Sequence, residues 1–214
     1  MVLVARSVSE IDAVAAEIRS LGGKARAVRC DVTDDVSLHA LFQGLTRCDV
    51  LINNAGGNKP QPFVEVSAES LDDLLRLNVR SMFRCAQHAA RLMQHQRSGT
   101  IVNMSSQMGH VGAANRTVYC MTKHAIEGLT KAMAVELAPL SIRVNAVAPT
   151  FVETPLTAPM LANSQFRDDT LRRIPLGRIG TIGEVVAAVL FLASQESSLI
   201  TGTSLLVDGG YTAQ

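Results

Sequence analysis

Residues 50–56, with the sequence VLINNAG, run from a short apolar stretch into a polar turn that contains a glycine. Similar apolar runs rich in β-branched residues recur along the chain, and amphipathic helical segments separate them. This alternation predicts parallel strands covered by helices on both faces of one sheet. We therefore expect an α/β fold, a doubly wound parallel sheet, built as a single domain from residues 1–214.

The same periodicities predict where each element begins and ends. Strands are expected at residues 2–5, 25–30, 50–53, 100–104, 143–147 and 204–207. Helices are expected at residues 9–21, 67–96, 117–137 and 181–193, and a further helix begins at Thr33 or Asp34 and ends near residue 45. Ser9 and Ser67 are suitable N-cap residues, and Gly22 and Gly23 end the first helix.

Composition argues against several classes of function. The 214 residues are 47% hydrophobic and 18% charged, which suits one well-buried domain. The formal net charge is +1 and like charges form no run, so we expect neither a nucleic acid nor a membrane surface as a partner. The apolar stretches are too short to cross a bilayer, and the first residues do not read as a signal peptide. We therefore expect a cytoplasmic protein.

Cysteine and histidine spacings indicate no metal site. Cys30, Cys48, Cys85 and Cys120 are scattered without a Cys-x-x-Cys pair, which indicates reduced thiols. The histidines form no His-Glu-x-x-His sequence, so metal-dependent hydrolysis is not indicated. A serine hydrolase is not indicated either, because the chain has no Gly-x-Ser-x-Gly turn.

Four polar residues stand at spacings typical of a catalytic tetrad. Tyr119 and Lys123 are four residues apart on a predicted helix, so their side chains share one face. The ammonium group favours the phenolate and lowers the tyrosine pKa, which suits a general acid/base. Ser106 lies thirteen residues before Tyr119, with Ser105 as the alternative, and Asn78 lies forty-one residues before it. By itself, a Tyr-x-x-x-Lys sequence also fits an exposed helix pair.

Further motifs surround the tetrad. An Asp-Val pair follows the strand at 25–30, residues 53–56 read NNAG, residues 145–154 read NAVAPTFVET, and residues 208–210 read DGG. In this order and at these distances, the motifs resemble the short-chain dehydrogenase/reductase family over essentially the whole chain. The resemblance implies a Rossmann-like domain and an enzyme that uses a nicotinamide dinucleotide to reduce carbonyls or oxidise secondary alcohols.

The resemblance also implies a role for each member of the tetrad. Tyr119 would donate a proton to the carbonyl oxygen during reduction and accept it during oxidation. Lys123 would hydrogen-bond the nicotinamide ribose, and Ser106 would stabilise charge on the reacting oxygen. Asn78 would hold a water that relays protons from Lys123.

Cofactor contacts follow by the same resemblance. Asp31 and Val32 match positions that contact the adenine, although Asp31 also suits the N-cap of the next helix. The remaining contacts would be made to the adenine ribose by Asn54, Ala55 and Gly56, and to the nicotinamide amide by Val152 and Thr154. Tyr119 and Lys123 would contact the cofactor as well. Thr150 departs from the family, which usually has glycine there.

The start of the chain departs furthest from the family. Relatives begin with a strand, a Thr-Gly-x-x-x-Gly-x-Gly turn and a helix, whereas residues 2–5 match their second strand. We therefore expect an N-terminally truncated domain that lacks the first strand and the glycine-rich cofactor loop. In the strand order 3-2-1-4-5-6 that strand is central, and the loop supplies amides for the pyrophosphate. Either a misplaced start codon or a genuine short product would explain why the strand and the loop are missing.

The end of the strand expected at residues 2–5 bears on cofactor choice. An acidic residue there binds the ribose 2′-hydroxyl of NAD, while an arginine meets the 2′-phosphate of NADP. Ala5 takes the acidic position and Arg6 follows it. NADP is therefore the expected cofactor, with NAD as the alternative.

The substrate is not identified by the sequence. Residues 155–174 match a mobile substrate loop of the family, and loops of this length are often lids. Apolar side chains that would cover an apolar substrate are Leu156, Met160, Leu161 and Phe166. Arg172 and Arg173 would equally hold an anion, and all of these residues would also suit a subunit contact.

Two functions remain at this stage. The favoured one is an active NAD(P)-dependent oxidoreductase. The alternative is a truncated, catalytically impaired fragment that acts only by associating with related subunits. In either case the helices at 67–96 and 117–137 carry small residues that allow close packing, so we expect a homodimer or homotetramer.

Overall fold

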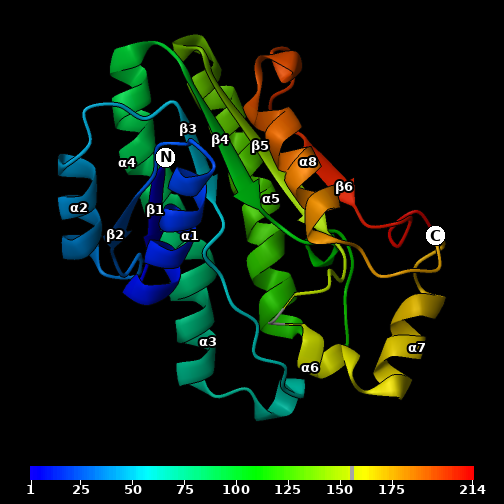
Figure 1. The fold of residues 1–214 in the computed structure, drawn as a ribbon. Coiled ribbons are helices and arrows are strands. Elements are labelled where there is room, and N and C mark those ends of the chain that lie inside the picture. Colours follow the sequence, from blue (N-terminus) through cyan, green and yellow to red (C-terminus); the bar gives the residue numbers. More distant parts are fainter. Residues whose placement is uncertain (155–156) are drawn as a thin grey trace.

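Six parallel strands form two sheets in the computed structural model, which describes residues 1–154 and 157–214. The first sheet pairs β1 (Val2–Ala5) with β2 (Arg26–Arg29). The second has the order β3 (Val50–Asn53), β4 (Gly99–Met104), β5 (Ile142–Pro149) and β6 (Ser204–Val207). Helices lie on both sides of the strands (Figure 1), which confirms the predicted doubly wound α/β class.

The helices connect successive strands in the expected order. They are α1 (Val8–Ser20), α2 (Asp35–Gln43), α3 (Ala68–Leu75), α4 (Ser81–Gln96), α5 (Thr117–Leu137), α6 (Ala158–Leu161), α7 (Ser164–Arg172) and α8 (Ile182–Ala193). Short 3-10 turns occupy Phe63–Glu65, Gln107–Gly109, Ala138–Leu140 and Gln195–Ser197. Figure 1 shows α8 in front of the four-stranded sheet and α5 behind it.

The two faces of the larger sheet bury alternate residues of the same strands. Ile101 of β4 packs in a core cluster with side chains of α2, α4 and α5, whereas its neighbour Val102 packs against α8. Both side chains are fully buried. Because successive strand residues point to opposite faces, a strand covered on both sides buries successive residues. This explains why the neighbours Ile101 and Val102 are both apolar.

Several helix boundaries differ from the prediction. Ser7, not Ser9, stands at the N-cap of α1. Asp34 caps α2 by accepting hydrogen bonds from the amides of the second and third helical residues, while Asp31 binds Thr33 instead. The single helix expected at 67–96 is interrupted by a π-helical turn, Arg76–Arg80. Ser67 caps its first part, as predicted.

The segment expected as a substrate loop contains regular structure. It forms α6 and α7, and Leu161 is almost fully buried. Asn163 caps α7 by accepting a hydrogen bond from the amide of Phe166. Of the predicted covering residues, Leu156 lies outside the described residues.

A ladder of buried amide and hydroxyl groups joins β3 and β4 to α5. Asn53 donates to Asn103 Oδ1 at 3.0 Å, and Asn103 donates to Thr130 Oγ1 at 3.0 Å. The side chains of the ladder are themselves buried, so each hydrogen bond between them replaces one that the group would otherwise make to water. It sets the position of α5, which carries two of the predicted catalytic residues, relative to the sheet.

The two sheets share a core but, within the described chain, no backbone hydrogen bond joins them. Val4 of β1 and Leu51 of β3 pack against the same buried cluster. Yet β1 pairs only with β2, and β3 pairs only with β4. Each of these two strands therefore has one edge without a partner, and on β3 Val50 and Ile52 remain 44% and 39% exposed.

Candidate active site

The predicted tetrad gathers at the carboxyl ends of the strands, where ligands of open α/β sheets bind. Ser106 follows β4 as the cap of a 3-10 turn, and Tyr119 and Lys123 lie in the first two turns of α5. Asn78 lies in the π-helical turn between α3 and α4. Residues separated by up to 45 positions thus meet at one edge of the larger sheet.

The Tyr119 and Lys123 side chains face each other. The Lys123 Nζ atom lies 5.5 Å from the centroid of the Tyr119 ring and donates a hydrogen bond to the carbonyl oxygen of Met104 at 2.8 Å. Burial lowers the pKa of Lys123 to about 8, although the Glu127 carboxylate opposes this shift. Because this pKa is close to neutral pH, Lys123 can release its proton more readily than an ordinary lysine.

The sequence-based expectation of a lowered tyrosine pKa was wrong. Burial raises the pKa of Tyr119 above its ordinary value, because desolvation disfavours the phenolate. The Ser106 hydroxyl and, to a lesser extent, the Arg116 charge lower the Tyr119 pKa in part. The desolvation of the phenol outweighs the neighbouring positive charge.

Of the two candidate serines, Ser106 lies beside the phenol. Among the groups that lower the Tyr119 pKa, the Ser106 hydroxyl has the largest effect. Ser106 Oγ accepts from the amide of Met108 at 3.2 Å and donates to Gln107 Oε1 at 2.9 Å. Ser105 Oγ is buried without a hydrogen-bond partner in the described residues.

Asn78 is fully buried, and its side-chain amide is committed to neighbouring groups. Asn78 Oδ1 accepts from the Gly57 amide at 2.8 Å, and Nδ2 donates to the Gly57 carbonyl at 2.8 Å. Nδ2 also donates to Thr122 Oγ1 at 3.1 Å, next to Lys123 in sequence. The side chain therefore ties the turn after β3 to α5. The π-helical turn that contains Asn78 shifts the regular backbone pairing of a helix, a feature frequent at functional sites.

A polar cluster behind Lys123 was missed by sequence reasoning. Glu127 Oε1 accepts a hydrogen bond from Ser204 Oγ at 3.1 Å and lies 3.3 Å from His110 Nε2. Glu127 is buried and raises the pKa of Lys123 in part. Its position four residues after Lys123 was the available signal, since that spacing places both on one helix face.

The candidate contacts to the adenine and to the 2′-phosphate lie at the ends of the strands of the smaller sheet. Arg6 is exposed just after β1, and Asp31 follows β2. Two hydrogen bonds from Thr33 hold the pKa of Asp31 below its usual range, and the Arg6 charge adds to this effect. Val32 instead packs partly into the core.

Asn54, Ala55 and Gly56 are exposed at the end of β3, directly after the buried Asn53. A Cβ atom at Gly56 would lie 3.3 Å from Asn78 Oδ1, so the turn fits closely against the π-helical segment. The three residues thus present their backbone at the carboxyl edge of the sheet, between the smaller sheet and the tetrad residues.

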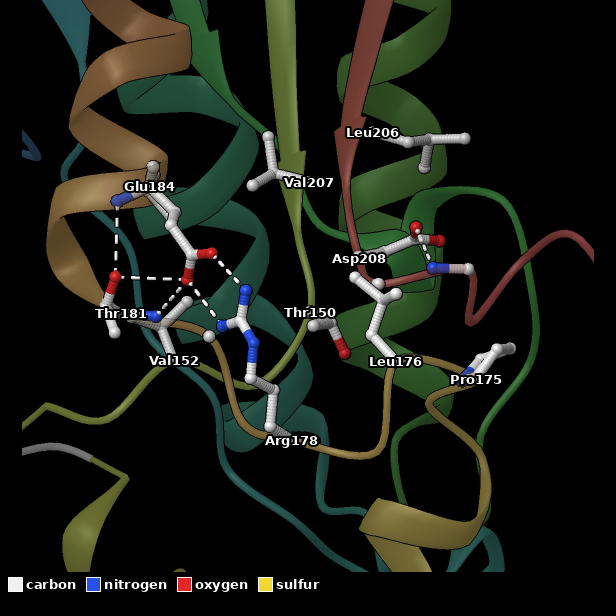
Figure 2. Close-up of a pocket in the computed structure, with 14 residues that line it drawn as sticks. Thr150, Val152, Pro175, Leu176, Arg178, Thr181, Glu184, Leu206, Val207 and Asp208 are labelled. Atoms are coloured by element: carbon white, nitrogen blue, oxygen red, sulfur yellow. Dashed lines mark hydrogen bonds and ion pairs between the residues drawn. The ribbon is translucent and has the colours of Figure 1, made fainter.

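A cavity of about 490 Å³ lies between the ends of β5 and β6 and the beginning of α8 (Figure 2). Val152 lines it, and Thr150 Oγ1 is buried there without a hydrogen-bond partner among the described residues. Thr181 and Glu184 form a capping box that also binds Arg178 and closes one side of the cavity. The hydroxyl of Thr154 contacts Thr157 instead.

These residues fit one end of a dinucleotide. An unpaired hydroxyl in a cavity beside Val152 suits a carboxamide, and the exposed turn at 54–56 suits a ribose. The chain contains no Thr-Gly-x-x-x-Gly-x-Gly turn that would bind the pyrophosphate.

A parallel α/β sheet with the half-buried Tyr119 beside the buried Lys123 at its carboxyl edge fits the class of NAD(P)-dependent oxidoreductases that act on CH–OH groups. The chain matches the family described as "Enoyl-(Acyl carrier protein) reductase" over residues 1–212. It belongs to this family of short-chain dehydrogenases/reductases.

Two curated relatives and one solved structure illustrate the likeness. L-xylulose reductase of Bos taurus is 40% identical over all of this chain and 86% of the relative. The 3-oxoacyl-(acyl-carrier-protein) reductase of Thermotoga maritima is 39% identical over 95% of this chain and 84% of the relative. A gluconate 5-dehydrogenase from Burkholderia cenocepacia, solved with NADP and tartrate, superposes with a TM-score of 0.95 at 30% identity, covering 100% and 85% of the two chains.

Proposed function

We propose that this chain transfers a hydride between a nicotinamide dinucleotide and a small carbonyl or secondary alcohol, with Tyr119 as the general acid/base. The observation that carries this proposal is the approach of the buried Lys123 Nζ to 5.5 Å from the ring centroid of the half-buried Tyr119, near the Ser106 hydroxyl. The relatives support it, since their names describe reductases of sugars and acyl thioesters.

Each tetrad member then has one task. Tyr119 gives its proton to the carbonyl oxygen in reduction, and Ser106 donates a hydrogen bond to that oxygen as negative charge develops. Lys123, with a pKa of about 8, is mostly protonated at neutral pH and returns a proton to the phenolate. Because the Asn78 side chain is already engaged, a relay water would bind its backbone carbonyl. The bound nicotinamide supplies or accepts the hydride.

NADP is the proposed cofactor, with NAD as the alternative. Arg6 is exposed at the end of β1, where a 2′-phosphate would lie, and its charge reaches Asp31. Solved structures similar to this chain include complexes with NADP. The proposed contacts are those of Arg6, Asp31, Val32, Asn54, Ala55, Gly56, Tyr119, Lys123, Val152 and Thr154.

The protein is also proposed to self-associate, as a homodimer or homotetramer, through α5. An exposed stripe on this helix consists of Met121, Ala125, Gly128, Ala132 and Val135. Small residues at such spacings allow two helices to approach closely. The small residues Ala86, Ala89 and Ala134 are instead buried in the core, so they are not available for this contact.

Gly128→Arg should convert the oligomer to monomers in light scattering. Nothing lies within 4 Å of a Cβ placed at Gly128, so the arginine is compatible with the monomer fold. Gly112→Arg, at another glycine with open space, is the control and should remain associated. An unchanged mass for the Gly128 variant would contradict the proposed interface.

The open edges of β1 and β3 bear on the alternative of an impaired fragment. A strand from outside the described residues, contributed by this polypeptide or by another, would pair with both edges and cover the exposed Val50 and Ile52. This pairing would occur in an active enzyme and in an associating fragment alike, so a measurement of turnover is needed to distinguish the two.

Tyr119→Phe in the full-length protein tests the catalytic proposal. We expect turnover of carbonyl compounds, followed through oxidation of the reduced nicotinamide, to fall roughly 10²–10⁴-fold because the proton donor is lost. Cofactor affinity should be nearly unchanged. Ser106→Ala should also lose activity, whereas Ser105→Ala, whose hydroxyl has no partner, should keep it. Activity that survives Tyr119→Phe would rule out this proton donor.

A further inference from the structure

A second cavity lies near the beginning of α5. It has a volume of about 320 Å³ and is bounded by the loop before α5, the segment after β5, and α7. Arg116 and Arg173 line it together with apolar side chains of Met108, Phe151 and Phe166. This volume is at the lower limit for small-molecule sites. The cavity therefore suits a small, partly apolar molecule.

Arg116 connects this cavity to the proposed proton donor. It is the N-cap residue of α5, three positions before Tyr119, and residues at this spacing are neighbours on the helix surface. The Arg116 charge lowers the pKa of Tyr119 in part, and Tyr119 in turn affects the pKa of Arg116. Arg116 therefore lies between the cavity, which it lines, and Tyr119, which does not line the cavity itself.

The guanidinium group of Arg116 is poorly satisfied for a half-buried charge. Burial lowers its pKa. Its two hydrogen bonds are long: Nη1 to the carbonyl of Asn115 at 3.3 Å and Nη2 to Met160 Sδ at 3.7 Å. A thioether is a weak acceptor, and a guanidinium group has five donors. Most of its hydrogen-bonding capacity is unused by the described residues.

Arg143 shows how the same fold satisfies a structural arginine. Its guanidinium donates to the Ser197 and Thr100 hydroxyls and to the Ser194 and Ile200 carbonyls, at 2.9–3.2 Å. Burial lowers the pKa of both arginines. Only Arg116 lacks such a set of acceptors, although it lines a cavity large enough to admit one.

The charges around the cavity favour an anion. Arg173 contributes a second guanidinium, whose hydrogen bond to the Tyr211 hydroxyl is 3.5 Å long. Asp169 also lines the cavity, but its carboxylate is paired with Arg172. Within residues 1–154 and 157–214, neither Arg116 nor Arg173 has a carboxylate at salt-bridge distance. The cavity thus carries an excess of positive charge.

We propose that the substrate of this enzyme bears a carboxylate, which Arg116 binds together with Arg173 while the carbonyl or alcohol carbon reaches Tyr119. This inference rests on the proposed oxidoreductase function and specifies its substrate class as oxo acids and hydroxy acids. The rings of Phe151 and Phe166, 5.5 Å apart in an edge-to-face arrangement, form the wall along which the carbon chain lies. Guanidinium and carboxylate pair through two parallel hydrogen bonds.

The first test compares acids with their neutral analogues. The full-length protein is assayed with oxo acids of increasing chain length, each beside its methyl ester. We expect kcat/KM to be roughly tenfold or more higher for the best acid than for its ester, because charge-assisted hydrogen bonds are strong. Arg116→Met should abolish this preference while turnover of the ester persists. Arg167→Met, which removes an exposed arginine of α7 outside the cavity, should retain it.

A second measurement separates this inference from the proposed function. The affinity for succinate, an unreactive dicarboxylate, is measured by calorimetry for the unmodified protein, Arg116→Met and Arg116→Lys. We expect Arg116→Met to weaken binding about tenfold or more and Arg116→Lys to restore part of it. Equal succinate affinity in all three proteins, or esters turned over as well as acids, would overturn the carboxylate site. Absence of any turnover with intact succinate binding would instead refute the oxidoreductase proposal alone.

Discussion

The strand β1 of the two-stranded sheet is as apolar as the strands of the four-stranded sheet, but the two sheets are buried to different extents. In β4 and β5 the side chains of Ile101, Val102 and Val144 are fully buried. All four residues of β1 are only half-buried, and those of β2 are half-buried or exposed. The difference arises because β4 and β5 each have a strand on both sides and helices on both faces, whereas β1 has one neighbour. An apolar strand sequence therefore does not by itself guarantee a buried strand.

The proposed functional residues are distributed between these two sheets. The catalytic candidates stand on or beside β4 and α5, where the buried ladder through Asn103 holds helix and sheet together. Arg6, the candidate contact to a 2′-phosphate, and Asp31, a candidate adenine contact, directly follow the strands of the smaller sheet. The proposed catalytic residues thus lie on the better-supported half, and the proposed cofactor-selecting residue lies on the less buried half. Four measurements can break or sharpen this comparison.

Hydrogen exchange should show the largest difference between the sheets. Amides of β4 and β5 should exchange roughly 10³-fold more slowly than those of β1, because central strands open only with global unfolding and weakly supported edges open locally. Mass spectrometry of peptides from the two regions, corrected for intrinsic rates, provides the measurement. Equal protection in both sheets would show that the unpaired edge of β1 costs no local stability.

Removal of the polar ladder should destabilise the larger sheet. Asn103→Ala leaves Asn53 and Thr130 without their partners in a buried environment, so we expect a loss of about 2–4 kcal/mol in the free energy of unfolding. Chemical denaturation measures this loss. Gln94→Ala removes an exposed amide on α4 and should change the same quantity by less than about 0.5 kcal/mol. A similar small change for Asn103→Ala would mean that the ladder does not hold the catalytic half together.

The buried charge of Lys123 should destabilise the catalytic half at neutral pH. The folded-state pKa of about 8, against an ordinary value of 10.5, corresponds to roughly 3 kcal/mol when the lysine must be protonated. Between these two values the unfolded chain binds more protons at this site than the folded chain, so its contribution to stability rises with pH. Below pH 8 the full penalty applies.

Lys123→Met should therefore be more stable than the unmodified protein at pH 7, and the advantage should shrink as pH approaches 10.5. Thermal and denaturant unfolding across this range test the trend. Lys131→Met, at an exposed position of the same helix, controls for the loss of one positive charge. A variant that is less stable at every pH would show that the hydrogen bond to Met104 outweighs the cost of burial.

The smallest expected effect lies on the smaller sheet. Arg6→Ala should weaken NADP binding about tenfold and leave NAD binding nearly unchanged, since only NADP has a 2′-phosphate. Arg29→Ala, an exposed arginine of β2, is the matched control and should affect neither cofactor. Equal losses for NADP and NAD in the Arg6 variant would refute its role in selecting the cofactor.

Local signals in the sequence predicted several elements to the residue. The helix expected at 117–137 and the strands at 50–53 and 204–207 have those bounds, and Ser67 caps its helix as expected. Periodicity and capping depend on residues within one or two turns, so they can be read without the rest of the chain. The π-helical turn at Arg76–Arg80 had no such signal beyond a poor helix former at Asn78, because its side chain is held by Gly57 and Thr122 from distant elements.

The sequence by itself determined the α/β class, the order of the elements and the spacing of Ser106, Tyr119 and Lys123. Only the tertiary structure decided that burial raises the pKa of Tyr119, that Asn53 and Asn103 pair across 50 positions, and that Arg116 faces a cavity. The reason is physical. Periodicity is a property of neighbouring residues, whereas desolvation and hydrogen-bond satisfaction depend on every element that packs around a group.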